Sequence, residues 1–367
     1  MKILLDLTSL ADNFSGIERF ALCIAKEMIK NREIQYILVF KNIIHPDFDY
    51  ELDNVQKVVI KGKNKLIFNQ FILPFKLYTL KADFYLFLAF PEPFFFFKKN
   101  AISAIHDVGC WDCPSKNKQW MTLYFRIMYR KCALGRKKII TVSEFSKKRI
   151  HVILKKQEKD IFVVYNGISK CFEPCGEMKN FEEESVVKYK LPKDYILCLS
   201  TLEPRKNLRL LIEAFTQLQN EKRLKCDLVL AGRKGWMMDD LLLGISEDIL
   251  NKIHFTGFID ENLLPYVYKK ARMFVFPSMY EGFGVPPIEA MYMGVPVVSS
   301  DAASLPEILK DGAVYFKNND VENLKTRIIE TLNSNDTELI QRGRKVSESY
   351  RWSTEGRKLI DIISRLY

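Results

Sequence analysis

Short apolar runs rich in β-branched residues alternate with longer amphipathic segments through almost the whole chain. In the first half, the runs that we expect to form strands are 2–7, 36–40, 57–60, 84–88, 101–105, 138–142 and 161–164. In the second half they are 195–199, 227–231, 253–256, 273–276, 295–299 and 313–316. Strands that alternate with helices form parallel sheets, because each connection must cross over the sheet face. The pattern therefore predicts an α/β fold built on parallel sheets.

The chain is long enough for two domains of ordinary size, at 367 residues. A polar stretch over 171–194, with Pro174, Gly176 and Pro192, separates its two halves. We expect Rossmann-like domains over residues 1–175 and 176–350, facing each other across a deep cleft at the carboxyl ends of their strands, where open α/β sheets bind ligands. Residues 351–367 have helical spacing, with Ser353 as the expected cap, and can pack back on the first domain.

The formal net charge of +11 lies entirely in the first half of the chain. Residues 1–180 contain 30 Lys and Arg against 18 Asp and Glu, whereas residues 181–367 contain 26 against 27. Such a basic face attracts nucleic acid, an anionic membrane or a phosphorylated substrate. No RNP, zinc-finger or helix-turn-helix pattern accompanies the charge, so we do not expect a nucleic acid as partner.

A basic amphipathic segment over 116–138 is the candidate membrane contact. Its apolar residues at helical spacing are Trp120, Leu123, Tyr124, Ile127, Met128 and Leu134, with Lys and Arg around them. Such a helix can lie on an anionic membrane surface or can bury its stripe in the domain core, and the sequence leaves both open. Without a spanning run or signal-peptide pattern, we expect a cytoplasmic protein, with attachment to the inner face of the membrane as a hypothesis.

The most informative motif is E-G-F-G-V-P-P-I-E over 281–289, between the expected strand 273–276 and a helical segment. Glycines let a backbone approach a ligand closely, and the N-terminus of a helix offers N–H groups to a phosphate. Pro286 and Pro287 suit the first helical turn. Glu281 and Glu289 bracket this cradle, and carboxylates accept hydrogen bonds from vicinal sugar hydroxyls. The alternative is an ordinary turn with its Glu side chains in water.

A second motif, L-E-P-R-K-N-L over 202–208, follows the strand 195–199 and opens a helix. Arg205 and Lys206 lie at the junction, where the helix dipole also favours anions. We interpret them as clamps for a diphosphate. The alternative is two solvated cations on a loop, which is the commoner environment for Lys and Arg.

Residues His106 and Asp107 follow the expected strand 101–105, and a His at a strand end is a catalytic candidate as well as a structural one. Gly16 stands alone after the first strand and does not form the G-x-G-x-x-G fingerprint. The second strand ends at Phe40 and Lys41 without an acidic residue, which argues against a dehydrogenase.

No metal site is expected. Cys110 and Cys113 form one tight pair, but a zinc site needs a second with matching geometry, so we expect free thiols. The D-x-D spelling at Asp47 and Asp49 lies beside Pro46, far in sequence from the phosphate cradle, and we interpret it as surface.

Together these segments resemble the GT-B retaining glycosyltransferases of family 4, the glycosyl transferases group 1, over nearly the whole chain. Segments 281–289, 201–207, 231–236 and 255–258 match the donor domain, and 141–146 and 164–168 match the first domain. The resemblance implies two Rossmann-like domains in a GT-B fold. It also implies transfer of a hexose from a sugar nucleotide to a saccharide acceptor with retention, and with no metal or other cofactor.

The resemblance also implies roles for the matched donor residues. Glu281 would bind hydroxyls of the donor sugar and support developing positive charge, and Glu289 would bind the ribose hydroxyls. Arg205 and Lys206 would neutralise the diphosphate. The remaining donor-binding residues would be Gly282, Phe283, Gly284 and Val285 at the sugar and phosphate, and Phe258 and Ile259 at the base. Gly16 would permit the donor phosphate or the acceptor to come close to the backbone.

On the acceptor side, His106 would lie against the transferred sugar, and Asp107 and Ser143 would belong to the acceptor site. Many family members carry an arginine five positions before the lysine, where this chain has Thr201. The E-P-R-K-N form resembles the mannosyltransferase-like branch. GDP-mannose is therefore the first expectation for the donor, and a lipid-linked saccharide in O-antigen or cell-surface polysaccharide synthesis for the acceptor. A UDP- or dTDP-sugar donor, or a nucleotide-sugar epimerase of the same architecture, is the alternative.

Overall fold

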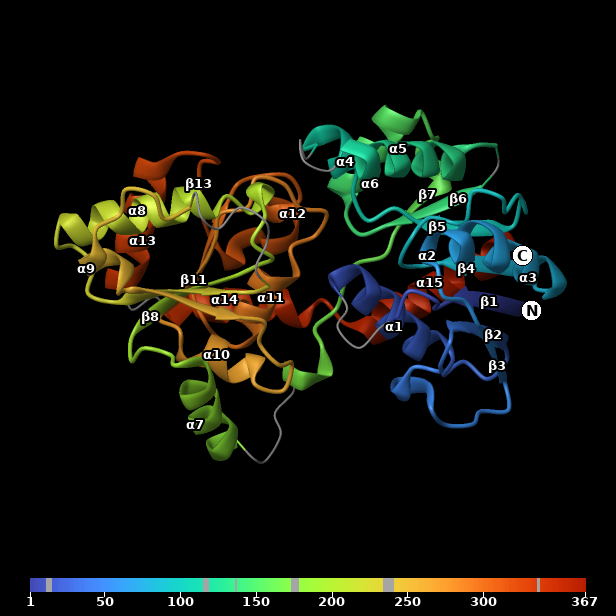
Figure 1. The fold of residues 1–367 in the computed structure, drawn as a ribbon, viewed down its shortest axis with the longest axis horizontal. Helices are drawn as coiled ribbons and strands as arrows, with labels where there is room; N and C mark the ends of the chain where they lie inside the picture. The colour runs from blue at the N-terminus through green and yellow to red at the C-terminus, as the bar shows by residue number, and fades with distance from the viewer. Residues whose placement is uncertain (11–14, 115–118, 136, 173–177, 234–240, 335–336) are drawn as a thin grey trace. The chain divides into compact units, whose positions relative to one another are not determined.

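The computed structural model describes residues 1–10, 15–114, 119–135, 137–172, 178–233, 241–334 and 337–367. The chain divides into two compact units, one made of Met1–Gly167 with Arg351–Tyr367 and the other of Ile168–Tyr350. The boundary expected between residues 175 and 176 falls in 173–177, outside the described residues. Each unit contains one parallel sheet with helices packed around it (Figure 1).

The sheet of the first unit has seven strands in the order β3-β2-β1-β4-β5-β6-β7. Their bounds are β1 Lys2–Asp6, β2 Gln35–Lys41, β3 Val55–Ile60, β4 Phe84–Phe87, β5 Ala101–Ala104, β6 Lys138–Thr141 and β7 Ile161–Val163. All neighbours pair in parallel, so the segments that leave β1 and β4 diverge to the two sides of the sheet. That divergence marks the ligand-binding position of an open α/β sheet.

The helices of the first unit cover both faces of this sheet. Their bounds are α1 Gly16–Met28, η1 Pro46–Phe48, α2 Lys65–Ile67, η2 Phe68–Ile72, α3 Leu73–Thr79, α4 Gly109–Asp112, α5 Gln119–Ala133, α6 Glu144–Leu154, η4 Glu158–Asp160 and α15 Trp352–Leu366. Helices α4, α5 and α6 form one group on the β6 and β7 side (Figure 1). Asp47 of η1 is paired with Lys26 of α1 through a 2.7 Å contact between Nζ and Oδ2.

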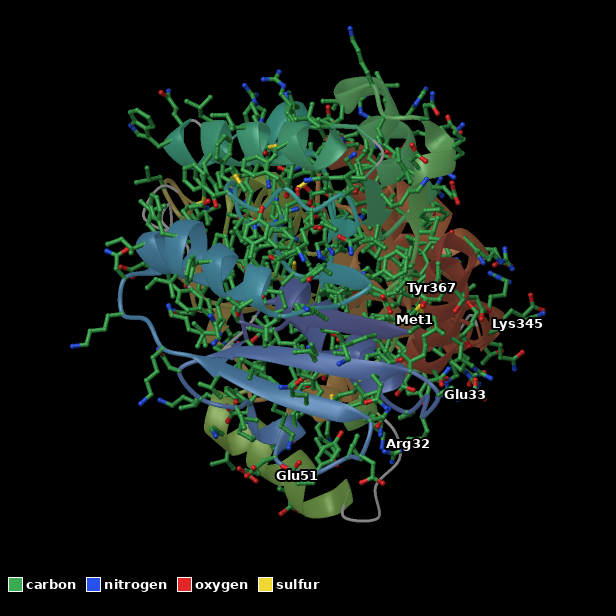
Figure 2. The ribbon with its side chains drawn as sticks, turned by 90° about the vertical axis from the view of Figure 1, so that its right-hand side faces the viewer. Met1, Arg32, Glu33, Glu51, Lys345 and Tyr367 are labelled. Carbon is green, nitrogen blue, oxygen red and sulfur yellow. The ribbon has the colours of Figure 1, made fainter. Side chains whose placement is uncertain are left out.

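The terminal helix α15 returns to the first unit and packs along α1. The expected cap at Ser353 is wrong, because the helix begins one residue earlier, at Trp352, with Arg351 as its N-cap. Trp352 is buried, and its ring lies 6.0 Å from that of Phe20, so packing rather than a capping side chain sets the helix start. Tyr367 consequently lies close to Met1 (Figure 2).

The sheet of the second unit has six strands in the order β10-β9-β8-β11-β12-β13. Their bounds are β8 Tyr195–Leu199, β9 Asp227–Ala231, β10 Ile253–Gly257, β11 Met273–Phe276, β12 Val297–Ser300 and β13 Val314–Phe316. Strand β12 begins two residues later than expected. Pro296 has no N–H to donate, although its carbonyl accepts a hydrogen bond from the Phe274 N–H at 2.9 Å. The order of the strands reverses between β8 and β11, because the chain continues from β8 to β9 on one side and from β11 to β12 on the other.

The helices of the second unit are η5 Lys170–Phe172, α7 Met178–Tyr189, η6 Pro204–Lys206, α8 Leu208–Asn220, α9 Glu247–Leu250, α10 Leu264–Lys270, α11 Val285–Tyr292, α12 Leu305–Leu309, η7 Lys310–Gly312, α13 Val321–Asn333 and α14 Thr337–Glu348. Helices α8 and α13 lie side by side, as do α7 and α10 (Figure 1). Among the helices that the structure describes in both units, none combines the length and the apolar composition needed to cross a lipid bilayer.

Part of the polar stretch 171–194 is a helix, where the sequence indicated only a break between domains. Lys188 of α7 pairs with Asp260 at 2.6 Å, and the Asp260 N–H donates to the Tyr189 hydroxyl at 2.9 Å. These contacts attach α7 beside α10, within the second unit. A mostly polar helix held by such contacts has no strong apolar periodicity from which the sequence could predict it.

The close approach of two strand ends predicts a strong effect at Gly232. A Cβ atom there would lie 1.9 Å from the Ser200 carbonyl oxygen, and the φ of +137° is one that side chains rarely adopt. We expect Gly232→Ala to lower the free energy of unfolding by more than about 2 kcal/mol, measured by chemical denaturation.

Gly244→Ala is the matched control, because Gly244 also has a positive φ, +81°, but no atom lies within 4 Å of the position that its new methyl group would occupy. This variant should lose only about 1 kcal/mol of stability, because its new side chain strains the left-handed backbone but meets no other atom. Equal losses for the two variants would contradict the steric explanation.

Candidate active site

Two loops of the second unit meet where β8 and β11 end side by side. The Met279 N–H donates a hydrogen bond to the Arg205 carbonyl at 2.8 Å, and the Ser278 hydroxyl oxygen lies 3.2 Å from the same carbonyl oxygen. The loop after β8 and the loop after β11 are therefore attached through their backbones. This is the switch point of the sheet, where such folds bind ligands.

The acidic and basic residues of the two motifs form one ionic cluster. Lys206 Nζ lies 2.5 Å from Glu281 Oε1, and Arg205 Nη1 lies 3.3 Å from Glu281 Oε2. Ser278 also donates its hydroxyl to Glu281 Oε1 at 2.7 Å. Lys206 and Glu281 are both buried, so the alternatives of a solvated lysine and a solvated glutamate do not hold for this pair.

The charge state of Glu281 follows from these neighbours. Burial alone would raise the pKa of Glu281, but Lys206 and Arg205 outweigh it and hold that pKa below its ordinary range. Glu281 is therefore an anion at neutral pH. Arg205 is also bound by Glu203, at 2.5 Å. Two cations thus face two carboxylates, and an anionic ligand must compete with these carboxylates for them.

Three serines around this cluster were not identified from the sequence. Besides Ser278, Ser300 donates its hydroxyl to the Ser278 carbonyl at 2.5 Å, and Ser304 donates to the Glu281 carbonyl at 3.0 Å. Ser300 ends β12, the neighbour of β11. Serines that follow adjacent parallel strands were the available signal, because such strand ends share one edge of the sheet.

The glycine motif forms the start of helix α11. Gly284 is the N-cap with a φ of +89°, and a Cβ there would lie 2.7 Å from Leu305 Cδ2. Amides in the first turn of a helix have no partner within the helix, and Pro286 and Pro287 carry no N–H. Gly284 and Val285 therefore supply the amide donors at this helix end. Gly282 and Phe283 precede them, and the buried Phe283 ring packs edge-on against Tyr350 at 5.3 Å.

Glu289 lies on the inner side of α11 and is buried. The Tyr268 hydroxyl donates a hydrogen bond to Glu289 Oε2 at 3.0 Å. The carboxylate is thus held by α10 rather than solvated, which the sequence left open. Tyr268 is a second residue that the motif alone did not reveal.

A half-exposed aromatic ring follows β10. Phe258 has 48% of its surface exposed, and the Arg233 guanidinium carbon lies 4.9 Å from the centre of its ring. Ile259 beside it is buried. A flat ring of this kind offers a stacking surface for a planar ligand. Arg233 lies in the matched segment 231–236, of which residues 234–236 are outside the described part.

In the first unit, His106 follows β5 and contacts the end of β4. Its Nε2 lies 2.9 Å from the Leu88 carbonyl, which can only accept, so Nε2 carries the proton and Nδ1 keeps a lone pair. The Phe20 ring packs edge-on against the imidazole at 5.0 Å. Burial lowers the pKa of His106, and the ring is neutral at pH 7.

The other expected residues of the first unit have local structural contacts. Asp107 Oδ1 accepts a hydrogen bond from the Gly109 N–H at 2.8 Å. Ser143 is the N-cap of α6, and its hydroxyl accepts from the Ser146 N–H at 3.0 Å. Gly16 opens α1, and a methyl group at its position would meet open space. These residues follow β5, β6 and β1, at the same edge of the first sheet as His106.

The lowered pKa of His106 predicts a pH-dependent contribution to stability. The unfolded chain takes up the proton near pH 6.5, while the folded chain resists it, so stability falls as the pH drops below about 6.5. His106→Gln can keep the hydrogen bond to Leu88 without titrating. We expect the melting temperature of the wild type to exceed that of the variant by less at about pH 5 than at about pH 7.5. A difference that does not change with pH would show that His106 has its ordinary pKa.

Several known proteins are similar to this chain. Residues 180–346, which contain the ionic cluster and the glycine motif, match the family model described as Glycosyl transferases group 1. O-antigen chain mannosyltransferase B of Escherichia coli is 28% identical over 377 aligned residues, 97% of each chain. Serotype-specific mannosyltransferase WbdA of Escherichia coli is 32% identical over 185 residues, 49% of this chain and 23% of that protein.

Among solved structures, that of Anabaena Alr3699/HepE in complex with UDP and glucose is similar over 100% of both chains, with a TM-score of 0.71 and 16% sequence identity. This likeness concerns the fold: two parallel α/β sheets of six and seven strands. With the family match and the curated relatives, it leads to one assignment: the chain is a glycosyltransferase of the GT-B fold, and its residues 180–346 match the glycosyl transferases group 1 family.

Proposed function

We propose that this glycosyltransferase moves a mannosyl residue from GDP-mannose to a lipid-linked saccharide, in the synthesis of an O-antigen or another cell-surface polysaccharide. The buried cluster of Arg205, Lys206 and Glu281 supports the sugar-nucleotide part of the proposal. The mannosyl donor and the acceptor are supported by the similarity to O-antigen chain mannosyltransferase B over 97% of the chain.

The departing nucleoside diphosphate is the main charge that the site must stabilise. Arg205 and Lys206, with the amides of Gly284 and Val285, offer positive charge and donors at one end of the sheet. In a partly buried site such groups stabilise a developing anion more strongly than water does. They supply the stabilisation that other enzymes obtain from a divalent ion. We therefore propose that transfer needs no metal and continues in the presence of a chelator.

The diphosphate and the sugar bind different residues of the ionic cluster. When the phosphates bind Lys206 and Arg205, Glu281 is released from part of its pairing. Ser278 still orients its carboxylate. Glu281 then accepts hydrogen bonds from sugar hydroxyls and faces the positive charge that develops at the anomeric carbon.

The reaction retains the configuration of the sugar. The bond between the anomeric carbon and the phosphate oxygen breaks, and the acceptor oxygen forms its bond on the same face. The proton of the acceptor hydroxyl passes to the departing phosphate oxygen. His106 is the proposed neighbour of the transferred sugar, because its Nδ1 lone pair can accept a hydrogen bond from a hydroxyl. Asp107 and Ser143 belong to the proposed acceptor site. Gly16 is the proposed position at which the donor phosphate or the acceptor comes close to the backbone.

The nucleoside is held by residues after β10 and on α11. Phe258 and Ile259 are the proposed contacts of the base, with Arg233 behind the Phe258 ring. Glu289, held by Tyr268, is the proposed ligand of the ribose hydroxyls.

The diphosphate assignment predicts the effect of Lys206→Met. Without added metal, GDP should raise the melting temperature of the wild type, since a ligand at 100 times its dissociation constant stabilises by about 2.7 kcal/mol. The variant keeps the length of the side chain but loses the charge that binds the phosphate. We expect the GDP-induced shift to fall below a third of the wild-type shift, each measured from the variant's own unliganded melting temperature.

Two further variants make this test specific. Lys225→Met removes an exposed lysine of the same unit and should leave the GDP shift unchanged. Glu281→Gln should keep the GDP shift but lower mannosyl transfer by about 10²-fold or more, because it removes a charge that acts on the sugar. If UDP, dTDP or ADP shifts the wild type and GDP does not, the donor assignment is wrong. If none does, the site assignment is wrong.

A further inference from the structure

The first unit exposes large apolar side chains from three segments. They are the helical stretch α2–η2–α3, the loop 93–97 after β4, and α5. Phe75 has 76% of its surface exposed and Trp120 has 86%. We call this surface the aromatic face and define it by Phe71, Phe75, Phe95, Phe97, Trp120 and Leu123. In Figure 2 the side chains of α5 project outward from the unit at the top of the view.

The core of the unit does not account for these side chains. The stretch over 65–79 buries Phe68 and Leu77 on its inner side and exposes Phe71 and Phe75 on its outer side. A helix that is apolar on both sides is expected in a protein interior or against lipid, and not in water.

Of the two alternatives left open for helix α5, the stripe buried in the core is the one that the structure does not fit. Of the six apolar residues expected along it, only Met128 is buried. Trp120, Leu123 and Ile127 are exposed. The apolar stripe of this basic helix therefore faces outward.

Direct contacts join the three segments into one surface. Gln70 of η2 is buried, and its amide donates to the Tyr124 hydroxyl of α5 at 2.9 Å. The same side chain accepts a hydrogen bond from the Phe94 N–H at 2.8 Å. The Phe71 and Phe95 rings lie 5.2 Å apart. One glutamine thus links the helical stretch, the loop and α5.

A buried lysine fixes the loop that carries the phenylalanines. Lys131, on the inner side of α5, donates to the Pro93 and Phe96 carbonyls at 2.6 Å each. It also pairs with Glu92 at 3.1 Å, and Lys137 is a second partner of Glu92. Lys131 and Lys137 belong to the Lys and Arg expected around the apolar stripe of 116–138, and for these two the expectation is wrong, because both are buried. The network holds the loop from beneath, so Phe95 and Phe97 stay on the outside.

The charge around the aromatic face indicates what covers it. Residues 61–143 contain 15 Lys and Arg against 4 Asp and Glu, an excess equal to the net charge of the whole chain. One of the four acids, Glu92, is buried and paired with lysines. Twelve of the 15 cations are lysines, among them the exposed Lys76, Lys81 and Lys99. Lysine is depleted at protein–protein interfaces, whereas lysines beside exposed aromatic side chains are typical of surfaces that bind anionic lipid.

We propose that the aromatic face docks the chain onto an anionic lipid bilayer. Its phenylalanines and Trp120 insert between the headgroups, while lysines such as Lys76 and Lys99 lie over the phosphates. This deepens the proposed function, on which it rests for its purpose: a docked enzyme meets an acceptor that is carried by a lipid.

Trp120 reports on this docking directly. With vesicles that contain phosphatidylglycerol, the tryptophan emission of the protein, to which Trp120 contributes as one of four tryptophans, should shift to the blue and become partly protected from acrylamide, and the protein should sediment with the vesicles at low salt. Vesicles of phosphatidylcholine alone should give neither effect. The double variant Phe75→Ser/Trp120→Ser should lose at least about tenfold in vesicle affinity, because both inserted side chains become polar.

Matched controls separate the aromatic face from exposure in general. Ile43→Ser/Leu243→Ser changes two residues that are similarly exposed elsewhere, 69% and 74%, and should bind vesicles like the wild type. Lys76→Glu/Lys99→Glu should weaken binding about tenfold or more, whereas Lys225→Glu/Lys269→Glu in the second unit should not. Each variant is first checked for a cooperative thermal unfolding transition like that of the wild type, which shows that it is folded.

The outcomes are separable from those for the donor site. A normal GDP shift with no vesicle binding would overturn the docking proposal and leave the proposed function standing. Vesicle binding without any nucleotide-induced shift would support the docking proposal and overturn the donor-site assignment. Equal binding to anionic and neutral vesicles would overturn the headgroup part of the proposal. Concentration-dependent dimers that disappear in Phe75→Ser/Trp120→Ser, without vesicle binding, would show that the face joins two copies of the chain.

Discussion

The buried ion pair between Lys206 and Glu281 is the interaction on which the second unit's site depends. Removing two charges from water is costly, and each is tolerated there only because the other, with Ser278 and Arg205, compensates it. The pair joins loops that are 75 residues apart in sequence. The same two charges have opposite tasks in the proposed reaction, one toward the phosphate and one toward the sugar. Donor binding is therefore an exchange of partners within a preformed cluster, not the filling of an open positive site.

The strands could be predicted closely because strands of parallel sheets are buried on both faces and read as continuous apolar runs. The expected runs 195–199, 227–231 and 273–276 coincide with β8, β9 and β11. Errors arose where contacts distant in sequence decide the structure. Helix α7 is held by the ion pair between Lys188 and Asp260, and α15 begins where Trp352 can be buried. Neither position has a local signal as strong as a capping serine, which is why Ser353 was the wrong choice.

For the site, the sequence identified residue types but not their partners. Arg205, Lys206, Glu281 and Glu289 stood out through motifs that follow strands, and those strand ends converge at one edge of the sheet. That Glu281 and Lys206 neutralise each other did not follow from spacing, nor did the hydrogen bond from Tyr268 to Glu289. A motif specifies which groups are available. The fold decides which of them already bind one another.

The same distinction applies to the lysines of the first unit, and it separates two uses of charge. Residues 181–367 are nearly neutral, with 26 basic and 27 acidic residues, so no long-range field of that half draws in a diphosphate. Binding there must come from close contacts such as Lys206 and the start of α11. In the first half, buried Lys131 and Lys137 are compensated by Glu92 and by carbonyl groups, which leaves the exposed lysines as the source of its field. Some of those lysines, such as Lys76 and Lys99, are close in sequence to the exposed Phe75 and Phe97. The large basic excess is therefore better explained by an extended anionic surface than by the nucleotide, whose charge the second unit handles locally.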